Sequence, residues 1–115
     1  MLLLLVLLQA PQVLDRYECQ GEHPQGKYEV SLTVVHEQDN YFLLWESHQA
    51  GIQTVQAKGF GIRTEDTFSA VYVTLNGQLG VIHYKVTAGR LEGVWAVGNG
   101  QMFVEVCSSG RRSSA

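Results

Sequence analysis

Six aromatic residues recur about once in each strand-like segment of the chain, and together they could form a ligand site. They are Tyr28, Tyr41, Trp45, Tyr72, Tyr84 and Trp95. If these side chains face one interior, they give it apolar walls and a few hydroxyl donors, which is how sites for small ligands are built. The same side chains would also serve as bulky filling for a small core. The sequence therefore predicts either a ligand pocket or a filled aromatic core.

The acidic residues give weaker grounds for chemistry. Those within strand-like segments are Glu29, Glu46, Glu92 and Glu105. Hydrolysis by a carboxylate pair would need two of them in one cleft. We expect them on the outer face, and Glu105 among them because it alternates with apolar neighbours. A carboxylate inside would need a hydrogen-bond donor, such as Tyr72, Tyr84 or Arg63.

The histidines show no metal-site spacing. They are His23, His36, His48 and His83, and none is paired with a His, Cys or carboxylate in the way that zinc sites require. We expect His83 on the outer face, together with Val81 and Lys85. The chain also has no Gly-x-Ser-x-Gly, no phosphate-binding glycine loop and no His-Glu-x-x-His. We therefore expect no catalytic residues, no metal, no cofactor and no enzyme activity.

The two cysteines, Cys19 and Cys107, lie near opposite ends of the folded segment. In a closed meander the first and last strands are neighbours, so a disulfide between them is predicted, with two separate buried thiols as the alternative. The chain-entropy model gives such a bridge roughly 4–5 kcal/mol of stability. Because there is no Cys-x-x-Cys, we expect a structural bridge and not a redox-active one.

The elements that must position these residues are strands, because no segment between them has a helical pattern. The expected strands cover residues 15–20, 27–37, 41–47, 52–58, 68–74, 80–86, 91–97 and 101–107. Every connection is too short for a parallel crossover. The pattern therefore predicts an all-β fold, a single eight-stranded antiparallel up-and-down barrel of the lipocalin or avidin kind. The alternative is a β-sandwich of two sheets.

Glycines and turn residues predict three irregularities in this barrel. We expect a loop over residues 21–26. Gly59-Phe60-Gly61 is expected to interrupt strand pairing at a bulge or sharp corner. Asn76-Gly77 is the strongest hairpin signal in the chain and predicts a type I′ turn.

Length and charge indicate one exported domain. The chain has 115 residues and a net charge of -3, which gives no basic surface for nucleic acid or anionic membranes. Residues 1–13 are predicted to be a signal-peptide-like or disordered segment, residues 14–107 the barrel and residues 108–115 a flexible tail. The apolar run Leu2–Leu8 is too short to span a bilayer and resembles the core of a secretory signal, although no basic residue precedes it. The alternative is an apolar element packed on the domain. We expect a periplasmic or secreted protein without a transmembrane span.

Recurrent Tyr, Gly and Trp positions resemble those of one group of proteins. The motifs are Tyr17-x-x-x-Gly21-x-x-Pro24-x-Gly26-x-Tyr28, Tyr41-x-Leu43-x-Trp45, Gly59-x-Gly61-Ile62, Gly80-Val81-x-x-Tyr84, Leu91-Glu92-Gly93-x-Trp95 and Glu105. They resemble a largely uncharacterised group of small exported bacterial β-barrel proteins, some loosely labelled fibronectin-binding. The resemblance implies a secreted or periplasmic barrel and carries no catalytic residues.

A second similarity concerns the cysteines. An early Tyr-x-Cys and a cysteine pair in the first and last strands are similar to the small-barrel periplasmic lysozyme inhibitors. The Ser-Gly loop with a following Tyr, expected near mid-chain in those inhibitors, is missing from this sequence.

Together these observations predict a binding module. In the first reading the barrel holds a small apolar or aromatic ligand, contacted by the six aromatic residues. In the second the barrel is filled and acts as an interaction or inhibitor module on an envelope or extracellular protein. The outer patch expected for that role contains Phe42, Leu44 and Phe103.

Overall fold

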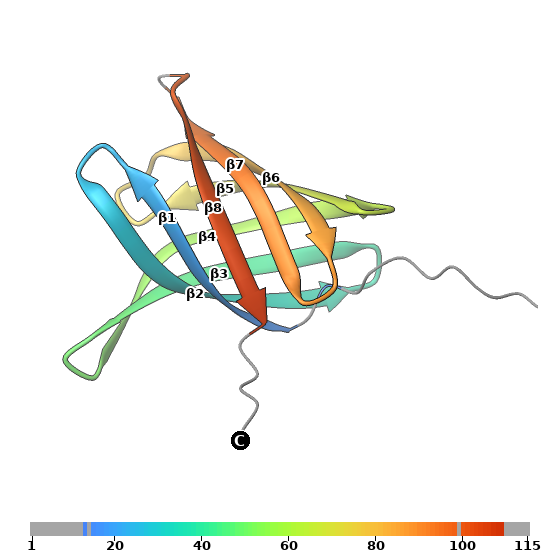
Figure 1. Cartoon of the computed structure of the whole chain (residues 1–115), viewed down its shortest axis with the longest axis horizontal. Helices are drawn as coiled ribbons and strands as arrows, with labels where there is room; N and C mark the ends of the chain where they lie inside the picture. Colours follow the sequence, from blue (N-terminus) through green and yellow to red (C-terminus); the bar gives the residue numbers. More distant parts are fainter. Residues whose placement is uncertain (1–12, 14, 99, 110–115) are drawn as a thin grey trace, which may run out of the picture.

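The computed structural model describes residues 13, 15–98 and 100–109, which form one closed antiparallel barrel (Figure 1). Its strands are β1 (Arg16–His23), β2 (Gly26–Glu37), β3 (Asn40–Gln49), β4 (Ile52–Thr64), β5 (Thr67–Thr74), β6 (Leu79–Thr87), β7 (Arg90–Val97) and β8 (Met102–Ser109). Each strand pairs with its sequence neighbours, and β8 pairs with β1. The predicted eight-stranded up-and-down barrel is confirmed, and the two-sheet sandwich does not form. No helix among the described residues has the length and apolarity to cross a bilayer.

Alternation of side chains along each strand separates the barrel interior from its outer wall. In β6, Ile82, Tyr84 and Val86 are buried, whereas Val81, His83 and Lys85 between them are exposed. This period of two is the expected pattern for a strand with one face on the core. The outward placement of His83 is therefore confirmed, and its ring bonds Ser69 on the neighbouring strand at 2.7 Å between Nδ1 and Oγ.

The predicted disulfide between Cys19 and Cys107 is present. The two residues are direct cross-strand partners in the β1–β8 ladder, and both are almost fully buried. The bond joins residues 88 positions apart. It therefore fastens the barrel at the pair of strands where the closed sheet returns to its start.

Interior tyrosines are paired with glycines across the strand ladder. Tyr28 is the cross-strand partner of Gly21, Tyr72 of Gly80 and Tyr84 of Gly93. A Cβ added to any of these three glycines would collide with the ring or hydroxyl of its tyrosine. Each ring therefore lies against the neighbouring strand, in the space left by the missing side chain. This is the known packing of an aromatic residue over a strand glycine.

The interruption of strand pairing expected at Gly59-Phe60-Gly61 is wrong. The segment Gly59-Phe60-Gly61 does not interrupt pairing, because β4 runs through it with every residue in register with β5. The register shift lies instead opposite Trp45 and Glu46 of β3. The glycines serve close packing, since a Cβ at Gly59 would collide with the Val71 carbonyl oxygen.

The turns also differ from the prediction. Residues 21–23 continue β1, and only Pro24 and Gln25 separate it from β2. At Asn76-Gly77 only Gly77 has a positive φ, so the turn is not type I′. The Gly77 N–H instead bonds the Thr74 carbonyl oxygen, which closes a tight turn ahead of a left-handed glycine. The two ends of the chain, 1–12 and 110–115, lie outside the described residues, and with them the signal-peptide-like run Leu2–Leu8.

Candidate functional site

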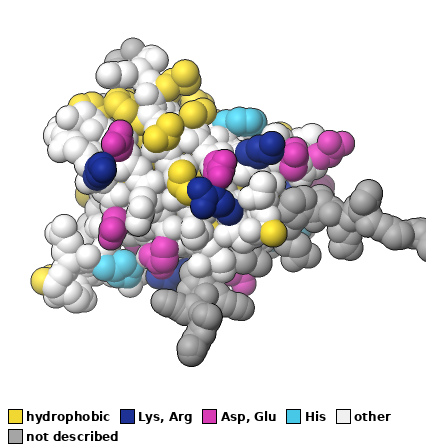
Figure 2. Space-filling model, in the orientation of Figure 1, with side chains coloured by type: hydrophobic (Ala, Val, Ile, Leu, Met, Phe, Trp, Pro, Cys, Tyr) yellow, Lys and Arg dark blue, Asp and Glu magenta, His cyan; other side chains and the backbone are white. Residues whose placement is uncertain are grey.

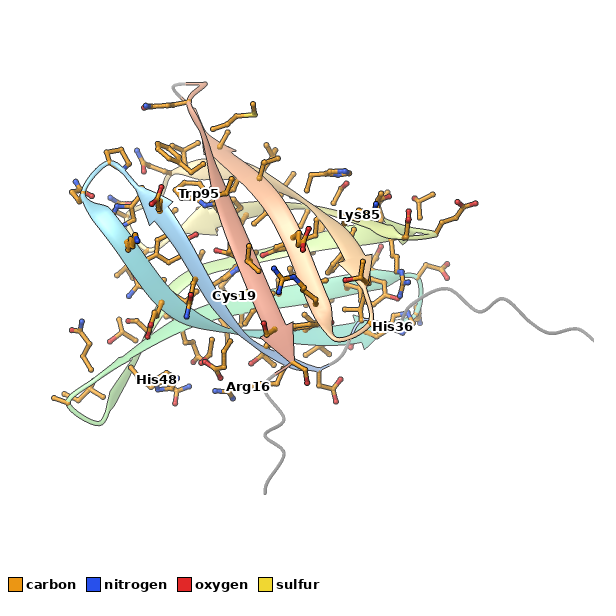
Figure 3. The ribbon with its side chains drawn as sticks, in the orientation of Figure 1. Arg16, Cys19, His36, His48, Lys85 and Trp95 are labelled. Atoms are coloured by element: carbon orange, nitrogen blue, oxygen red, sulfur yellow. A yellow bond between two sulfur atoms is a disulfide. The ribbon has the colours of Figure 1, made fainter. Side chains whose placement is uncertain are left out.

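One half of the barrel interior is open, and it forms the candidate site. A cavity of about 970 Å³ lies at the end of the barrel that carries the β1–β2, β3–β4 and β5–β6 turns. Its volume falls in the usual range for small-molecule sites. Four aromatic residues from four different strands line it, namely Tyr28, Trp45, Tyr72 and Trp95. Figure 3 shows Trp95 on the inner side of the barrel wall, near this end of β7.

The other half of the interior is filled. Its largest fully buried side chains are Tyr17, Leu32, Phe68, Tyr84 and Leu91. Rings there contact one another, with 6.2 Å between the centroids of Phe68 and Tyr84. The interior is therefore packed with side chains in one half of the barrel and open in the other half.

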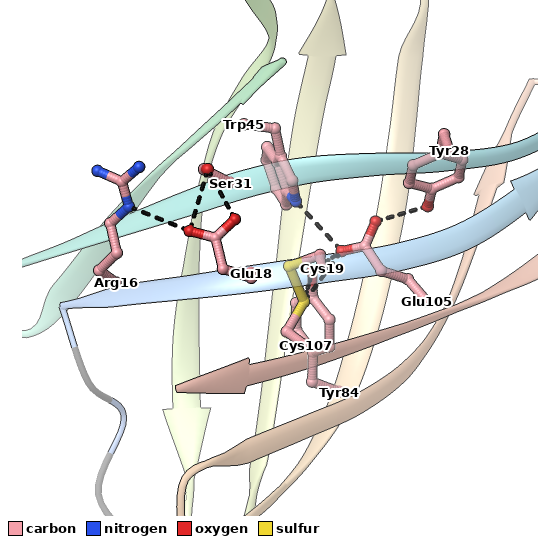
Figure 4. Close-up of a disulfide and its surroundings, with 9 residues drawn as sticks. All are labelled: Arg16, Glu18, Cys19, Tyr28, Ser31, Trp45, Tyr84, Glu105 and Cys107. Carbon is pink, nitrogen blue, oxygen red and sulfur yellow. Dashed lines mark hydrogen bonds and ion pairs between the residues drawn. A yellow bond between two sulfur atoms is a disulfide. The ribbon is translucent and has the colours of Figure 1, made fainter. Parts of the chain in front are cut away.

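Glu105 lies between the two halves and points inward, so the prediction that it lies outside is wrong. Its side chain is only 3% exposed. Oε1 accepts a hydrogen bond from the Tyr28 hydroxyl at 2.6 Å, and Oε2 accepts from the Tyr84 hydroxyl at 2.5 Å and the Trp45 indole at 3.3 Å (Figure 4). Of the donors expected for an interior carboxylate, Tyr84 is used, whereas Tyr28 and Trp45 were not foreseen.

The alternation of inward and outward side chains along β8 explains the placement of Glu105. Positions 103, 105 and 107 alternate with the outward Val104 and with Val106, and the disulfide directs Cys107 inward. Glu105 must then share the face of Cys107, and the Sγ atom of Cys107 lies 3.5 Å from its Oε2. The predicted disulfide was the signal in the sequence from which an interior Glu105 could have been inferred.

Burial governs the titration of this cluster. Removal from water raises the pKa of Glu105, and the hydrogen bonds from Tyr28, Tyr84 and Trp45 lower it without cancelling the rise. The pKa values of Tyr28 and Tyr84 are also raised, first by burial and then by the nearby carboxylate. The same two causes raise the pKa of Tyr72 to about 12. The phenols therefore stay protonated and act as donors at physiological pH.

Trp95 supplies a polar atom without a partner. Its indole Nε1 is buried and makes no hydrogen bond among the described residues. It lies close enough to Tyr28 to lower the pKa of that hydroxyl, against the larger rise caused by burial and by Glu105. A buried donor left unbonded costs roughly 1–3 kcal/mol.

The comparison with known proteins adds nothing to this geometry. Neither a family model nor a curated protein sequence matches the chain. The assignment of a function must therefore rest on the cavity and on the residues that line it.

The structure brings together four of the six aromatic residues predicted for the site. Tyr84 lies in the filled half of the barrel, and its hydroxyl donates a hydrogen bond to Glu105 from that side. Tyr41 lies away from the cavity, packed edge-on against Phe68 at 5.1 Å and stacked on His36 at 4.3 Å between ring centroids. The cavity also contains Ala57 and Ile82, whose apolar side chains carry no signal in the sequence that would distinguish them from core residues.

A metal site is not supported by the donor atoms gathered near Glu105. Ligand atoms of Cys19, Glu105 and Cys107 lie within 4.8 Å of one another. Both sulfur atoms are joined in the disulfide, and metals bind cysteine as the thiolate. This cluster therefore offers one carboxylate and no thiolate ligand.

The outer wall carries an apolar row. One residue from each of β2 to β8 stands in direct cross-strand register with the next, namely Val35, Phe42, Phe60, Val71, Val81, Ala96 and Met102. Figure 2 shows hydrophobic side chains gathered over the end of the barrel where β7 meets β8. Of the patch predicted from the sequence, Phe42 is exposed and Leu44 half-buried. Phe103 instead packs against Trp95, at 4.9 Å between ring centroids.

Proposed function

We propose that this protein is an exported binding module that holds a small ligand with an apolar or aromatic body in the open half of its barrel. The observation that carries the proposal is the cavity of about 970 Å³ with its four aromatic walls and the buried Glu105 carboxyl at its floor. Apolar walls with a few convergent polar groups are typical of small-ligand sites. The buried disulfide is compatible with export, since such bonds persist in oxidising compartments.

Both tryptophans of the chain lie in the cavity wall, and Trp95 carries a buried donor. A folded protein seldom leaves a buried donor without an acceptor, and Nε1 of Trp95 has none among the described residues. Trp45 is also a wall of the cavity and bonds Glu105. Both tryptophans of the chain therefore report on any molecule that enters.

A neutral fluorescent probe, N-phenyl-1-naphthylamine, tests this function. Binding should raise the emission of the probe and quench that of the protein. Ala57→Phe places a ring inside the cavity and should weaken probe binding by about tenfold or more, whereas Lys58→Phe adds the same ring on the outer face of the same strand. Lys58→Phe should bind like the natural chain. Absence of probe binding, or equal binding by the Ala57→Phe variant, would overturn the proposal.

The outer wall supports a second candidate function, association with a protein through an apolar surface. Eleven large apolar side chains on β3 to β8 are exposed, namely Phe42, Ile52, Phe60, Ile62, Val71, Val73, Leu79, Val81, Val94, Met102 and Val104. Because the wall of a closed barrel curves, one partner can cover only those on adjacent strands. A second copy of the chain is the partner we assign, because an uncharged row is complementary to itself about a two-fold axis.

Sedimentation velocity tests the second candidate. The natural chain should show a concentration-dependent dimer. The double variant Phe60→Ser/Val71→Ser, changed at two adjacent partners in the row, should remain a monomer with an unaltered circular dichroism spectrum. A monomer at every concentration of the natural chain would exclude self-association through this wall.

A further inference from the structure

Glu105 is a buried carboxyl that no cationic side chain accompanies. The ion pairs between described residues are Arg16–Glu18 and Arg90–Glu92, both on the outside of the barrel. The pKa of Glu105 is affected by burial and by three neutral donors, and by no Lys, Arg or His. Buried charges in proteins are normally paired. When Glu105 is ionised, a positive charge beside it would therefore have to come from outside the described residues.

One hydrogen-bonding position on Glu105 remains open toward the cavity. An ionised carboxylate accepts about four hydrogen bonds. Oε2 already accepts two, from Tyr84 and Trp45, whereas Oε1 accepts one, from Tyr28. Tyr28 is itself a wall of the cavity. The remaining acceptor position is thus on Oε1, the carboxylate oxygen on the cavity side.

Aromatic rings line the cavity on which that position opens. Trp45 meets Tyr72 edge-on at 5.6 Å between ring centroids, and Tyr28 meets Trp95 at 6.2 Å. Both pairs line the cavity. The negative faces of such rings attract organic cations within about 6 Å, most strongly where water is excluded. A carboxylate inside a group of aromatic rings is favourable for an ammonium ion and offers little to an anion.

We propose that the ligand of the cavity is an organic cation, a protonated amine on an apolar or aromatic body, whose N–H donates to Oε1 of Glu105. The proposal rests on the proposed function, since it names the chemical class of the molecule that the cavity holds. The apolar body would lie among Trp45, Tyr72 and Ile82, which line the cavity above Glu105.

The charge of Glu105 makes this binding depend on pH in one direction. An ammonium ion beside Oε1 favours the ionised carboxylate, so amine affinity should rise with pH through the raised pKa of Glu105. The titratable groups that face Glu105 are Tyr28 from β2, Tyr72 from β5 and Tyr84 from β6, and their raised pKa values keep them neutral below pH 9. The disulfide from β1 and β8 does not titrate.

The remaining strands add little charge to the interior. Trp45, Ala57 and Trp95 line the cavity from β3, β4 and β7 and do not titrate. At the mouth, His23, Lys27, Glu29 and His48 are ionisable residues that line the opening. None of them contributes to the pKa of Glu105. Comparison with a variant that lacks the Glu105 carboxyl therefore separates the ionisation of Glu105 from that of the residues at the mouth.

Calorimetric titration with 2-phenylethylamine and its neutral counterpart 2-phenylethanol tests the proposal. At pH 8 the amine should bind about tenfold tighter or more, and its advantage should shrink toward pH 5. Glu105→Gln should reduce the preference to less than about threefold. That variant keeps one oxygen to accept from Tyr84 and Trp45, and its amide N–H donates to the Tyr28 oxygen. Glu92→Gln, the same change on the outer wall, should leave the preference intact.

Each outcome decides the matter. Equal or tighter binding of the alcohol would overturn the cation and indicate a neutral ligand that accepts from Trp95 and donates to Glu105. A preference for the amine that is independent of pH, or that survives in the Glu105→Gln variant, would place the cation elsewhere. If the naphthylamine probe binds but the amine has no advantage, the cavity function stands and only the cation is wrong. If no small molecule enters, both proposals fail.

Discussion

Neutralising Glu105 should change how the stability of the protein depends on pH. The pKa of Glu105 is raised in the folded protein because the carboxyl is buried. Between the unfolded pKa of about 4.3 and the raised value, the folded state holds a proton that the unfolded state has lost. The stability contributed by this group is complete below the unfolded pKa. It is lost progressively as pH rises through the folded pKa.

The magnitude follows from the single proton involved. One proton bound only by the folded state gives a slope of about 1.4 kcal/mol per pH unit in the free energy of unfolding. Glu105→Gln has no such proton. The free energy of unfolding of Glu105→Gln minus that of the natural chain should therefore increase with pH at up to this slope. The difference should become constant above the folded pKa.

Urea unfolding monitored by tryptophan emission, at half-unit steps from pH 4.5 to 8, measures this difference without a ligand. Subtraction of the two chains removes the titration of all other carboxyls. Glu92→Gln is the matched control, and because Glu92 is exposed its difference should vary much less with pH. A constant difference for Glu105→Gln would refute the reasoning, since burial would then not dominate. A difference that decreases with pH would mean that Tyr28, Tyr84 and Trp45 together outweigh burial.

Three further predictions concern the disulfide, the tyrosine donors and the strand glycines. The double variant Cys19→Ala/Cys107→Ala should lose about 4–5 kcal/mol of unfolding free energy, because the disulfide closes a loop of 88 residues. Calorimetry should then show a fall of roughly 20–30 °C in Tm. A fall below about 5 °C would contradict this. Tyr28→Phe removes a donor that lowers the pKa of Glu105. The midpoint of a carbon-detected NMR titration of that carboxyl should therefore shift to higher pH. An unchanged midpoint would exclude the hydrogen bond. Gly59→Ala should lower the free energy of unfolding by about 1–3 kcal/mol or more, because its Cβ meets the Val71 carbonyl oxygen. Gly98→Ala is the control, since a Cβ there meets no atom within 4 Å. Equal thermal melts of the two variants would show that the backbone near Gly59 shifts to accommodate the methyl group.

The fold could be predicted from the sequence because its determinants are local. Alternation of apolar and polar residues over eight segments, separated by short turns, leaves a meander as the simplest solution. Closure was predictable from the number of strands, since eight suffice to close a barrel and closure leaves no exposed edge. Closure in turn makes the strands of Cys19 and Cys107 neighbours. The strand glycines misled because Gly59 and Gly61 mark close packing of neighbouring strands as readily as a break in pairing, and only the pairing partner distinguishes the two.

The candidate site could be predicted only in part. The aromatic residues were found by type and spacing, and Tyr28, Trp45, Tyr72 and Trp95 do meet in one cavity. Which half of the barrel stays open depends on side-chain volumes summed over all strands, and no local pattern encodes it. The prediction placed Glu105 outside because its neighbours Val104 and Val106 are apolar. It did not use the fact that Glu105 lies two residues from Cys107 and so must share the inward face of that residue.

The pairing of tyrosines with glycines has a consequence for how such a barrel could diverge. Each ring occupies the volume that its partner's absent side chain leaves free, as for Tyr28 over Gly21 and Tyr84 over Gly93. Any side chain at the glycine displaces the ring, and loss of the ring leaves a hollow beside bare backbone. Mutations at the two positions are therefore coupled, and related sequences should exchange both residues together. For Tyr28 and Tyr84 the coupling extends to Glu105, because both hydroxyls donate to its carboxylate. The glycine opposite each ring therefore helps to fix the position of a group that it does not hydrogen-bond.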